Sequence, residues 1–226
     1  MKAEMRFGFE NRRQAGRFLA DKLGLYSGRD DLVILALPRG GVPVAFEVAS
    51  ELNAPLDVFV VRKLGVPGQE ELAFGAIATG GERVLNYGLV HALGINQHMI
   101  ESITDRETAE LERREKLYRG SNAPADVGGK TVIIVDDGLA TGATMRVAVE
   151  AVKRKAPRQI VIAVPIGSKH TCAEFAAKVD ALCICAVTPE PFYGVGEWYQ
   201  DFSQTSDDEV CELLDRARIG YHRRAA

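Results

Sequence analysis

The sequence predicts an α/β protein in which helices cover both faces of a parallel β-sheet. Five short apolar runs, rich in β-branched residues, have the length of strands, and segments with the 3.6-residue period of helices separate them. Runs that are apolar at nearly every position are typical of strands buried on both faces of a sheet. Strands that alternate with helices form right-handed βαβ crossovers, so we expect residues 1–226 to form a single domain.

The expected strands are defined by these apolar runs, of which Thr131–Val135 (TVIIV) is typical. Each run is five to seven residues long, which suits a strand better than a helix. The five runs are Leu32–Leu37, Leu56–Val61, Thr131–Val135, Gln159–Val164 and Ala181–Val187.

The expected helices lie before and between these strands. A first helix near Asn11–Leu23 has Asn11 as its N-cap and ends at Gly24. The helix Val42–Asn53 carries Pro43 in its first turn, where proline is tolerated. The other expected helices are Gly142–Lys155, Ser168–Lys178 and Ser206–Arg218.

A helical insertion, expected at about residues 88–120, breaks the alternation of strands and helices. Within it Asn96–Arg119 is polar, and Thr104 and Glu107 are spaced as a capping box. Its charges are mixed in sign, so we expect a solvated helix that lies on the domain or on the second subunit of a homodimer. A C-terminal hood or helix is expected at about residues 188–219.

The composition excludes several classes of function. Lys and Arg number 28 against 31 for Asp and Glu, and this net charge of −3 argues against nucleic acid as a partner. The apolar runs are far shorter than the ~20 residues of a membrane span, and Met1–Arg13 lacks the apolar core of a secretory signal. Four cysteines are too few for a disulfide framework. We therefore expect a cytoplasmic globular protein.

The most informative segment is Val132–Thr144 (VIIVDDGLATGAT), where a buried strand leads into two carboxylates, a turn of small residues and a helix. Asp-Gly is also a hairpin signal, but the helical period after Gly142 argues against a hairpin. An ordinary strand-to-helix loop with Thr141 or Thr144 as cap remains an alternative. The small side chains leave the N–H groups of Ala140–Thr144 free to converge on a phosphate at the positive end of a helix.

The two carboxylates, Asp136 and Asp137, directly precede this loop. Carboxylates repel phosphate, so we expect them at the sugar, where acidic residues accept hydrogen bonds from ribose hydroxyls in dinucleotide sites. The loop has neither the lysine of a Walker A motif nor a GxGxxG pattern. An acidic pair followed by a phosphate loop indicates a ribose 5-phosphate site.

The segment VIIVDDGLATGAT resembles the 5-phosphoribosyl-1-pyrophosphate signature of type I phosphoribosyltransferases, and it is most similar to the adenine phosphoribosyltransferase version. The resemblance implies the Rossmann-like fold of that family with a small hood. It also implies that Asp136 and Asp137 face the ribose hydroxyls and hold Mg²⁺, directly or through water. The residues that it assigns to substrate binding here are Gly138, Leu139, Ala140, Thr141, Gly142, Ala143 and Thr144.

A second anion site is expected at Pro38–Gly41 (PRGG), which follows the first strand and opens a helix. Gly-Gly after a strand is usually only a turn, but PRGG is similar to the pyrophosphate loop of xanthine-guanine phosphoribosyltransferases. The resemblance implies that Arg39, Gly40 and Gly41 bind pyrophosphate, with the Arg39 guanidinium as a clamp. It also implies a cis or otherwise strained peptide bond between Pro38 and Arg39.

Two further segments can each be interpreted in two ways: as ordinary structural elements, or as parts of the site that the resemblance implies. Basic pairs such as Arg62–Lys63 usually lie on solvated loops, whereas the resemblance implies that one of them contacts pyrophosphate and that Leu64–Leu72 folds over the site as a loop. The aromatic residues of Thr188–Phe202 are more often core or interface residues, whereas the resemblance implies that Phe192 or Tyr193 stacks on the base.

Together, PRGG, VRKLGVPGQEELAFGAIATGG, VDDGLATGAT and GEWYQDF resemble a group of bacterial predicted phosphoribosyltransferases over most of residues 6–215. The resemblance implies Mg²⁺-dependent transfer of the phosphoribosyl group from phosphoribosyl pyrophosphate to a nucleobase-like nitrogenous acceptor. The catalytic residues would be Arg39, Lys63, Asp136 and Asp137. Two alternatives are a non-catalytic regulatory protein that binds phosphoribosyl pyrophosphate and a hydrolase of phosphorylated ribosides.

Overall fold

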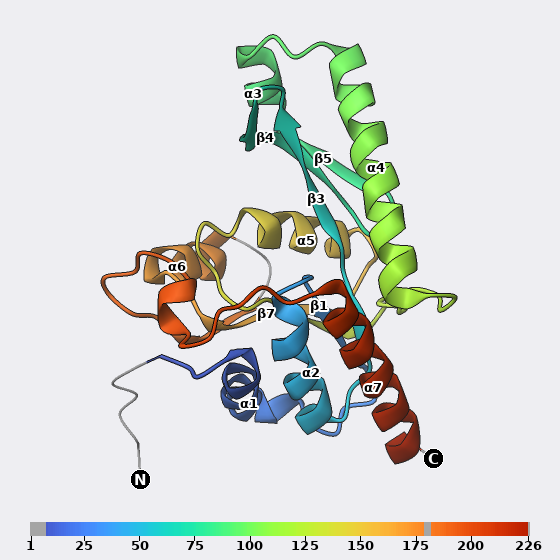
Figure 1. Cartoon of the computed structure of the whole chain (residues 1–226), viewed down its shortest axis with the longest axis vertical. Coiled ribbons are helices and arrows are strands. Elements are labelled where there is room, and N and C mark those ends of the chain that lie inside the picture. The colour runs from blue at the N-terminus through green and yellow to red at the C-terminus, as the bar shows by residue number, and fades with distance from the viewer. Residues whose placement is uncertain (1–7, 179–181, 226) are drawn as a thin grey trace.

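The centre of the molecule is a parallel sheet of five strands in the order β2-β1-β6-β7-β8. This sheet lies below the β3, β4 and β5 strands in Figure 1. The computed structural model describes residues 8–178 and 182–225. Strands β1 and β6 are neighbours in the middle of the sheet, paired from Leu32 and Thr131 to Ala36 and Val135. Because these strands are parallel, their carboxyl ends meet at one edge of the sheet, where ligands bind in open α/β sheets.

Four of the five predicted strands are confirmed, and the fifth divides. The run Leu56–Val61 forms β2 only as far as Val58, and at Val61 the chain leaves the central sheet and begins β3. Residue Ala181, predicted to begin the last strand, lies outside the described residues. The central strands are β1 (Leu32–Ala36), β2 (Leu56–Val58), β6 (Thr131–Val135), β7 (Gln159–Ile166) and β8 (Leu182–Val187).

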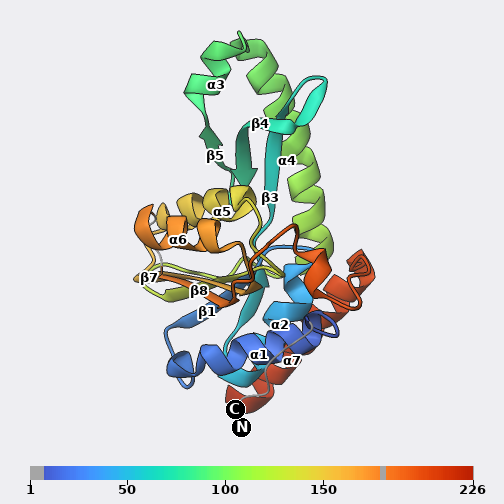
Figure 2. The same ribbon diagram turned by 90° about the vertical axis from the view of Figure 1, so that its left-hand side faces the viewer.

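Helices cover both faces of the central sheet (Figure 2). Strand residues alternate between the faces, so Ile34 and Ile133 join the core beside α1, α2 and α7, while Val33 and Val132 join the core beside α5 and α6. The Asn11 side chain caps α1 as predicted, because its Oδ1 accepts from the Gln14 N–H at 3.0 Å. The helices are α1 (Arg12–Lys22), α2 (Gly41–Leu52), α5 (Ala143–Lys153), α6 (Lys169–Lys178) and α7 (Asp207–Ala225).

A smaller antiparallel sheet and two helices project from one face of the molecule (Figure 1). The expected loop over Leu64–Leu72 is wrong, because these residues form the tip of the β3–β4 hairpin, whose turn contains Pro67 and Gly68. Gly68 has a φ of +78°, which lets the chain reverse direction there. The projection consists of β3 (Val61–Val66), β4 (Gln69–Ala78), β5 (Glu82–Leu85), α3 (Tyr87–Ala92) and α4 (Gln97–Arg119).

The long helix α4 begins at a different cap from the one expected. Asn96 is its N-cap and accepts from the Met99 N–H at 2.9 Å. The expected capping box is therefore wrong: Thr104 lies within the helix and donates to the Ile100 carbonyl, while Glu107 accepts from Arg62 of β3. The spacing of a capping box occurs by chance within helices, and only the helix start gives it a role.

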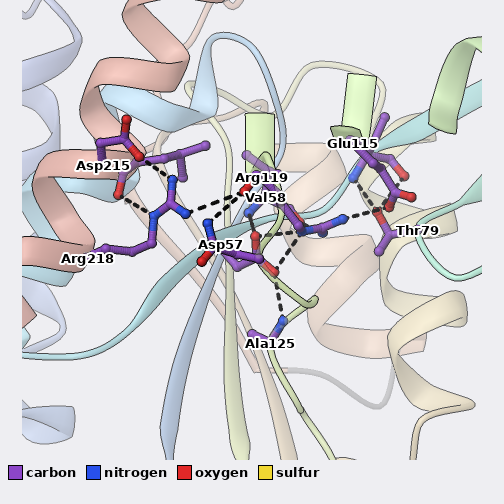
Figure 3. A network of polar contacts seen from close by, with 11 residues as sticks. Asp57, Val58, Thr79, Glu115, Arg119, Ala125, Asp215 and Arg218 are labelled. Atoms are coloured by element: carbon purple, nitrogen blue, oxygen red, sulfur yellow. Dashed lines mark hydrogen bonds and ion pairs between the residues drawn. The ribbon is translucent and has the colours of Figure 1, made fainter. Parts of the chain in front are cut away.

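A polar network ties the base of α4 to the central sheet (Figure 3). Arg119, whose side chain is 6% exposed, donates through Nε to both oxygens of Asp57 at 2.9 and 3.1 Å and through Nη1 to Glu115 at 2.9 Å. The same Asp57 carboxylate accepts from the Ala125 N–H at 2.8 Å. This buried, multiply hydrogen-bonded arginine holds the projection at a defined angle to the sheet.

The chain returns to the sheet edge through its C-terminal segment. Short 3-10 helices lie at Gly24–Tyr26 and Gly196–Trp198, and a parallel bridge joins Phe9 to Tyr199. Helix α7 then packs on α2 and α4. Across the described residues, none of the helices combines the length and the apolar character needed to cross a membrane.

Candidate active site

Two turns meet at the carboxyl edge of β1 and β6. The PRGG turn connects β1 to α2, and the acidic pair follows β6. A Cβ atom on Gly41 would lie 2.8 Å from the Val135 carbonyl oxygen and 3.0 Å from the Asp136 Cα. Only glycine therefore lets the two turns approach this closely, and the two predicted anion sites become neighbours.

The loop between β6 and α5 presents an open helix end to solvent. Gly142 is the N-cap of α5, with a left-handed φ of +73° that favours glycine, and within the described parts of the chain no side chain caps this helix start. The alternative, in which Thr141 or Thr144 caps this helix, is therefore wrong. Ala140, Thr141 and Ala143 are exposed, so the helix end and the Thr141 hydroxyl are accessible to an anion, with the half-buried Thr144 beside them.

The loop is supported by Ile166, Thr171 and Phe175, which the sequence analysis did not single out. The Leu139 N–H donates to the Ile166 carbonyl of β7 at 2.9 Å. Thr171 of α6 donates through Oγ1 to the Ala140 carbonyl at 2.6 Å, and Phe175 fills the space beside Gly142. Thr171 lies 31 residues beyond Ala140 in the chain, and no local signal in α6 indicates that it supports the loop.

The two carboxylates of the acidic pair have different surroundings. Asp136 lines the open cavity with the loop, and its Oδ1 accepts from the Asp137 N–H at 2.9 Å. Burial, together with the charge of Asp137, raises the pKa of Asp136 well above its ordinary value. Asp137 points to Arg12 of α1, whose Nε lies 2.8 Å from Oδ2. Burial raises the pKa of Asp137, while the hydrogen bond from Arg12 opposes that rise.

The PRGG turn has the expected backbone, since the peptide bond between Pro38 and Arg39 is cis. The Gly41 N–H donates to the Leu37 carbonyl at 3.0 Å and the Val42 N–H to the Arg39 carbonyl at 3.0 Å. The Arg39 guanidinium lies 3.7 Å from Asp207 at the start of α7. This long contact leaves Arg39 partly exposed at the sheet edge.

The basic pair of β3 is divided by strand alternation. Lys63 lines the cavity with Asp136 and the loop, whereas Arg62 points to the opposite face and donates to Glu107 of α4, with Nη2 and Oε2 2.6 Å apart. Of the two residues that the family pattern offered for pyrophosphate, the geometry brings only Lys63 to the cavity.

The aromatic pair after β8 is divided in a similar way. Phe192 packs against a core cluster that contains Phe9 and Tyr199, whereas the Tyr193 side chain is 79% exposed. Val195 reaches the loop, because a Cβ atom on Gly138 would lie 2.4 Å from its Cγ1. The C-terminal segment therefore forms one wall of the cavity, through Val195.

The cavity at this edge has a volume of about 170 Å³ and is open to solvent. It joins a carboxylate, an ammonium group and an open helix end. The lining residues are Lys63, Asp136, Gly138, Leu139, Ala140, Thr141, Gly142, Ala143, Thr144, Met145 and Val195. Such a set can hold a phosphorylated sugar, with the phosphate at the helix end and the hydroxyls at the carboxylate.

The chain matches known proteins over almost its full length. Two curated Mycobacterium tuberculosis proteins, provisionally named as phosphoribosyl transferases, are 47% identical over 209 residues, which is 92% of this chain. The chain spans about half the length of these relatives, since the match covers 47% of each.

Solved structures have the same fold. The crystal structure of the Thermus thermophilus protein TT1426 matches with a TM-score of 0.80 and 39% identity, over 92% of this chain and 98% of that one. A hypothetical Neisseria gonorrhoeae protein, solved with bound ppGpp, matches with a TM-score of 0.51 over 94% of this chain and 96% of that one. At 14% identity, the second likeness concerns the fold alone.

The family model described as "Phosphoribosyl transferase domain" matches residues 9–193. This segment contains the PRGG turn, Lys63, the acidic pair and the loop before α5. The chain therefore belongs to the phosphoribosyl transferase family.

Proposed function

We propose that the protein transfers the 5-phosphoribosyl group from phosphoribosyl pyrophosphate to a nucleobase-like nitrogenous acceptor and releases pyrophosphate. The observation that carries this proposal is the cavity that joins Asp136, Lys63 and the open start of α5. A ribose 5-phosphate ester needs a hydroxyl acceptor and a phosphate site side by side, and an adjacent anion site is needed for the leaving group.

The donor's ribose 5-phosphate half binds at the end of β6. The 5′-phosphate accepts hydrogen bonds from the backbone N–H groups of Ala140–Thr144 and from the two threonine hydroxyls, where the helix dipole favours negative charge. The Asp136 carboxylate accepts hydrogen bonds from the ribose hydroxyls. These contacts orient C1′ toward the acceptor and reduce the entropic cost of the reaction.

The leaving group binds at the PRGG turn. The acceptor nitrogen attacks C1′ while the bond between C1′ and the pyrophosphate oxygen breaks, and its electron pair leaves with pyrophosphate. Arg39 and Lys63 stabilise the charge that develops on this group, with the N–H group of Gly40 as a further donor. For this step Arg39 exchanges its long contact with Asp207 for the ligand.

The residues at the sheet edge fit a role for Mg²⁺. Magnesium usually takes one or two protein carboxylates and completes its shell with water and substrate phosphates, so Asp136 at the cavity wall is a suitable ligand. The bound ion would supply positive charge to the donor's oxygens. Asp137, already hydrogen-bonded to Arg12, is the less accessible of the two carboxylates.

The acceptor lies beside the C-terminal wall. Tyr193 is exposed two residues before Val195, so its ring is available to stack on a flat base. Phe192 supports this segment from the core.

Calorimetry with phosphoribosyl pyrophosphate, followed by pyrophosphate release across a panel of purines, pyrimidines and other amines, tests the proposal. We expect binding of the donor and acceptor-dependent release, with the donor bound about tenfold or more weakly by an Asp136→Asn variant that remains folded. Binding without release for any acceptor would favour the regulatory alternative. Release of ribose 5-phosphate from phosphorylated ribosides without an acceptor would favour the hydrolase.

A further inference from the structure

Arg12 of α1 is fixed on several sides. Its Nε donates to Asp137 Oδ2 at 2.8 Å, and its Nη1 donates to the Ser203 carbonyl at 2.7 Å. The guanidinium also lies over the Phe202 ring, 4.1 Å from the centroid. The side chain is 11% exposed and its Asp137 partner 16% exposed, so solvent screens this ion pair weakly.

The aromatic residues of the C-terminal segment hold this pair in place. Tyr199 stacks on Phe202 with ring centroids 5.1 Å apart, and its hydroxyl donates to the Asp137 main-chain carbonyl at 2.6 Å. The GEWYQDF motif therefore has a function that its sequence did not reveal. We call Arg12, Asp137, Tyr199 and Phe202 the Arg12 clamp.

The clamp touches the PRGG turn. A Cβ atom on Gly40 would lie 2.1 Å from Asp137 Oδ2 and 3.3 Å from Arg12 Nε. The Asp137 carboxylate is thus packed against the main chain of the turn that we assign to pyrophosphate. An unneutralised carboxylate at this position would repel a polyanion, and the Arg12 guanidinium cancels that charge.

We infer that Arg12 and Asp137 form a positioning pair that sets the shape and the charge of the pyrophosphate turn, while Asp136 alone binds the ribose hydroxyls. The inference rests on the proposed function for the identity of the ligand. It divides the acidic pair between the two halves of the site: one carboxylate faces the sugar, and the other, neutralised by α1, supports the leaving-group half. Arg12 touches no reacting atom in this assignment.

The division predicts an unequal effect of two substitutions. Arg12→Gln leaves a bare carboxylate against the turn, so pyrophosphate affinity should fall by about tenfold or more, the effect of losing one charge-assisted contact. Adding Asp137→Asn removes that carboxylate, so the double variant should bind pyrophosphate better than Arg12→Gln alone. Arg12→Lys keeps the charge and should stay within about threefold of wild type.

The experiment measures two quantities on the full chain. Calorimetry gives the affinities for inorganic pyrophosphate, ribose 5-phosphate and phosphoribosyl pyrophosphate, and hydrogen exchange follows the amides of Gly41 and Val42, which close the turn. Arg13→Gln is the matched control. Arg13 is next to Arg12 on α1, but it is 49% exposed and pairs with Glu47 instead.

We expect Arg12→Gln to speed exchange at the Gly41 and Val42 amides by about tenfold without changing β7. We expect Arg13→Gln to change neither exchange nor affinity. Recovery in Arg12→Lys and partial recovery in the double variant would support the clamp, even where Arg12→Gln itself is globally destabilised. Unchanged exchange in Arg12→Gln would overturn the inference. So would an Asp137→Asn single variant that has lower affinity for ribose 5-phosphate but unchanged affinity for pyrophosphate. Wild-type protein that binds none of the three ligands would refute the proposed function, while the exchange data would still decide whether the clamp holds the turn.

Discussion

A Cβ atom at position 40 would lie 2.1 Å from the Oδ2 atom of Asp137, so the backbone of Gly40 and this carboxylate are in direct contact. Gly40 has ordinary helical dihedral angles, with φ −58° and ψ −31°, so glycine is not required there for backbone freedom. It is required for space. The contact joins the turn after β1 to the acidic pair after β6, and it makes both sensitive to small changes in either.

The first prediction concerns Gly40→Ala. The added methyl group displaces the Asp137 carboxylate from its position beside Arg12, and we expect about a tenfold loss of pyrophosphate affinity. Calorimetry with pyrophosphate measures the loss. Gly24→Ala is the control, because a Cβ atom there meets nothing within 4 Å. Equal affinities in the two variants would show that the turn tolerates displacement of the carboxylate.

The second prediction separates stability from binding at Asp136. Because folding raises the pKa of this partly buried carboxyl, the folded state loses stability as the pH rises above the ordinary value of 3.8. Asp136→Asn removes that loss and keeps an acceptor for the Asp137 N–H. We expect the variant to melt roughly 2–4 °C higher at pH 7, as for about 1 kcal/mol, and to bind ribose 5-phosphate at least about tenfold more weakly.

The pH dependence provides the control for this prediction. The difference in Tm between Asp136→Asn and wild type should shrink as the pH falls toward 3.8, where the wild-type carboxyl is protonated in the folded state. A variant that is less stable than wild type at pH 7 would contradict the raised pKa of this carboxyl in the folded state.

A third prediction compares the neighbours Lys63 and Arg62. Lys63→Gln removes a cation from the cavity wall, so pyrophosphate affinity should fall about tenfold with little change in Tm. Arg62→Gln breaks the pair with Glu107 and leaves that carboxylate, 10% exposed, without its close partner on β3. We expect this variant to lose about 1–3 kcal/mol of stability instead. Thermal melts and calorimetry on both variants test this division, and the opposite pattern would reverse the assignment of the two strand faces.

The fourth prediction concerns Thr171, which supports the phosphate loop from α6. Thr171→Val keeps the shape of the side chain but removes the hydrogen bond to the Ala140 carbonyl, a bond of about 0.5–1.5 kcal/mol. Ribose 5-phosphate affinity should fall by roughly threefold to tenfold. Thr188→Val, at an exposed position, is the matched control. Identical affinities in the two variants would show that the loop keeps its shape without Thr171.

Local patterns were sufficient for the framework of the site. The run TVIIV specifies a strand buried on both faces, and the small residues after it specify an open turn into α5, because burial, side-chain branching and the missing Cβ of glycine act within a few residues. The same holds for the PRGG turn and for the Asn11 cap. Where two such segments follow neighbouring parallel strands, their meeting at one sheet edge also follows.

The local pattern gave a wrong prediction for a segment that could pair with either of two sheets. Leu56–Val61 is apolar at most positions and suits one strand, yet the chain leaves the central sheet after Val58, because residues from Val61 onward pair with β4 instead. Which sheet the residues join depends on pairing partners elsewhere in the chain. The strand propensity of the segment is compatible both with one continuous strand and with division between β2 and β3.

Only the tertiary structure decided which carboxylate of the acidic pair faces the cavity. Asp136 and Asp137 are adjacent and chemically identical, so their sequence context offers no distinction. The difference comes from Arg12, 125 residues away, which α1 brings against Asp137 and which Phe202 holds in position. Such a pairing depends on the angle at which a helix packs on a sheet. That angle is set by the summed packing of the whole core and is encoded at neither residue.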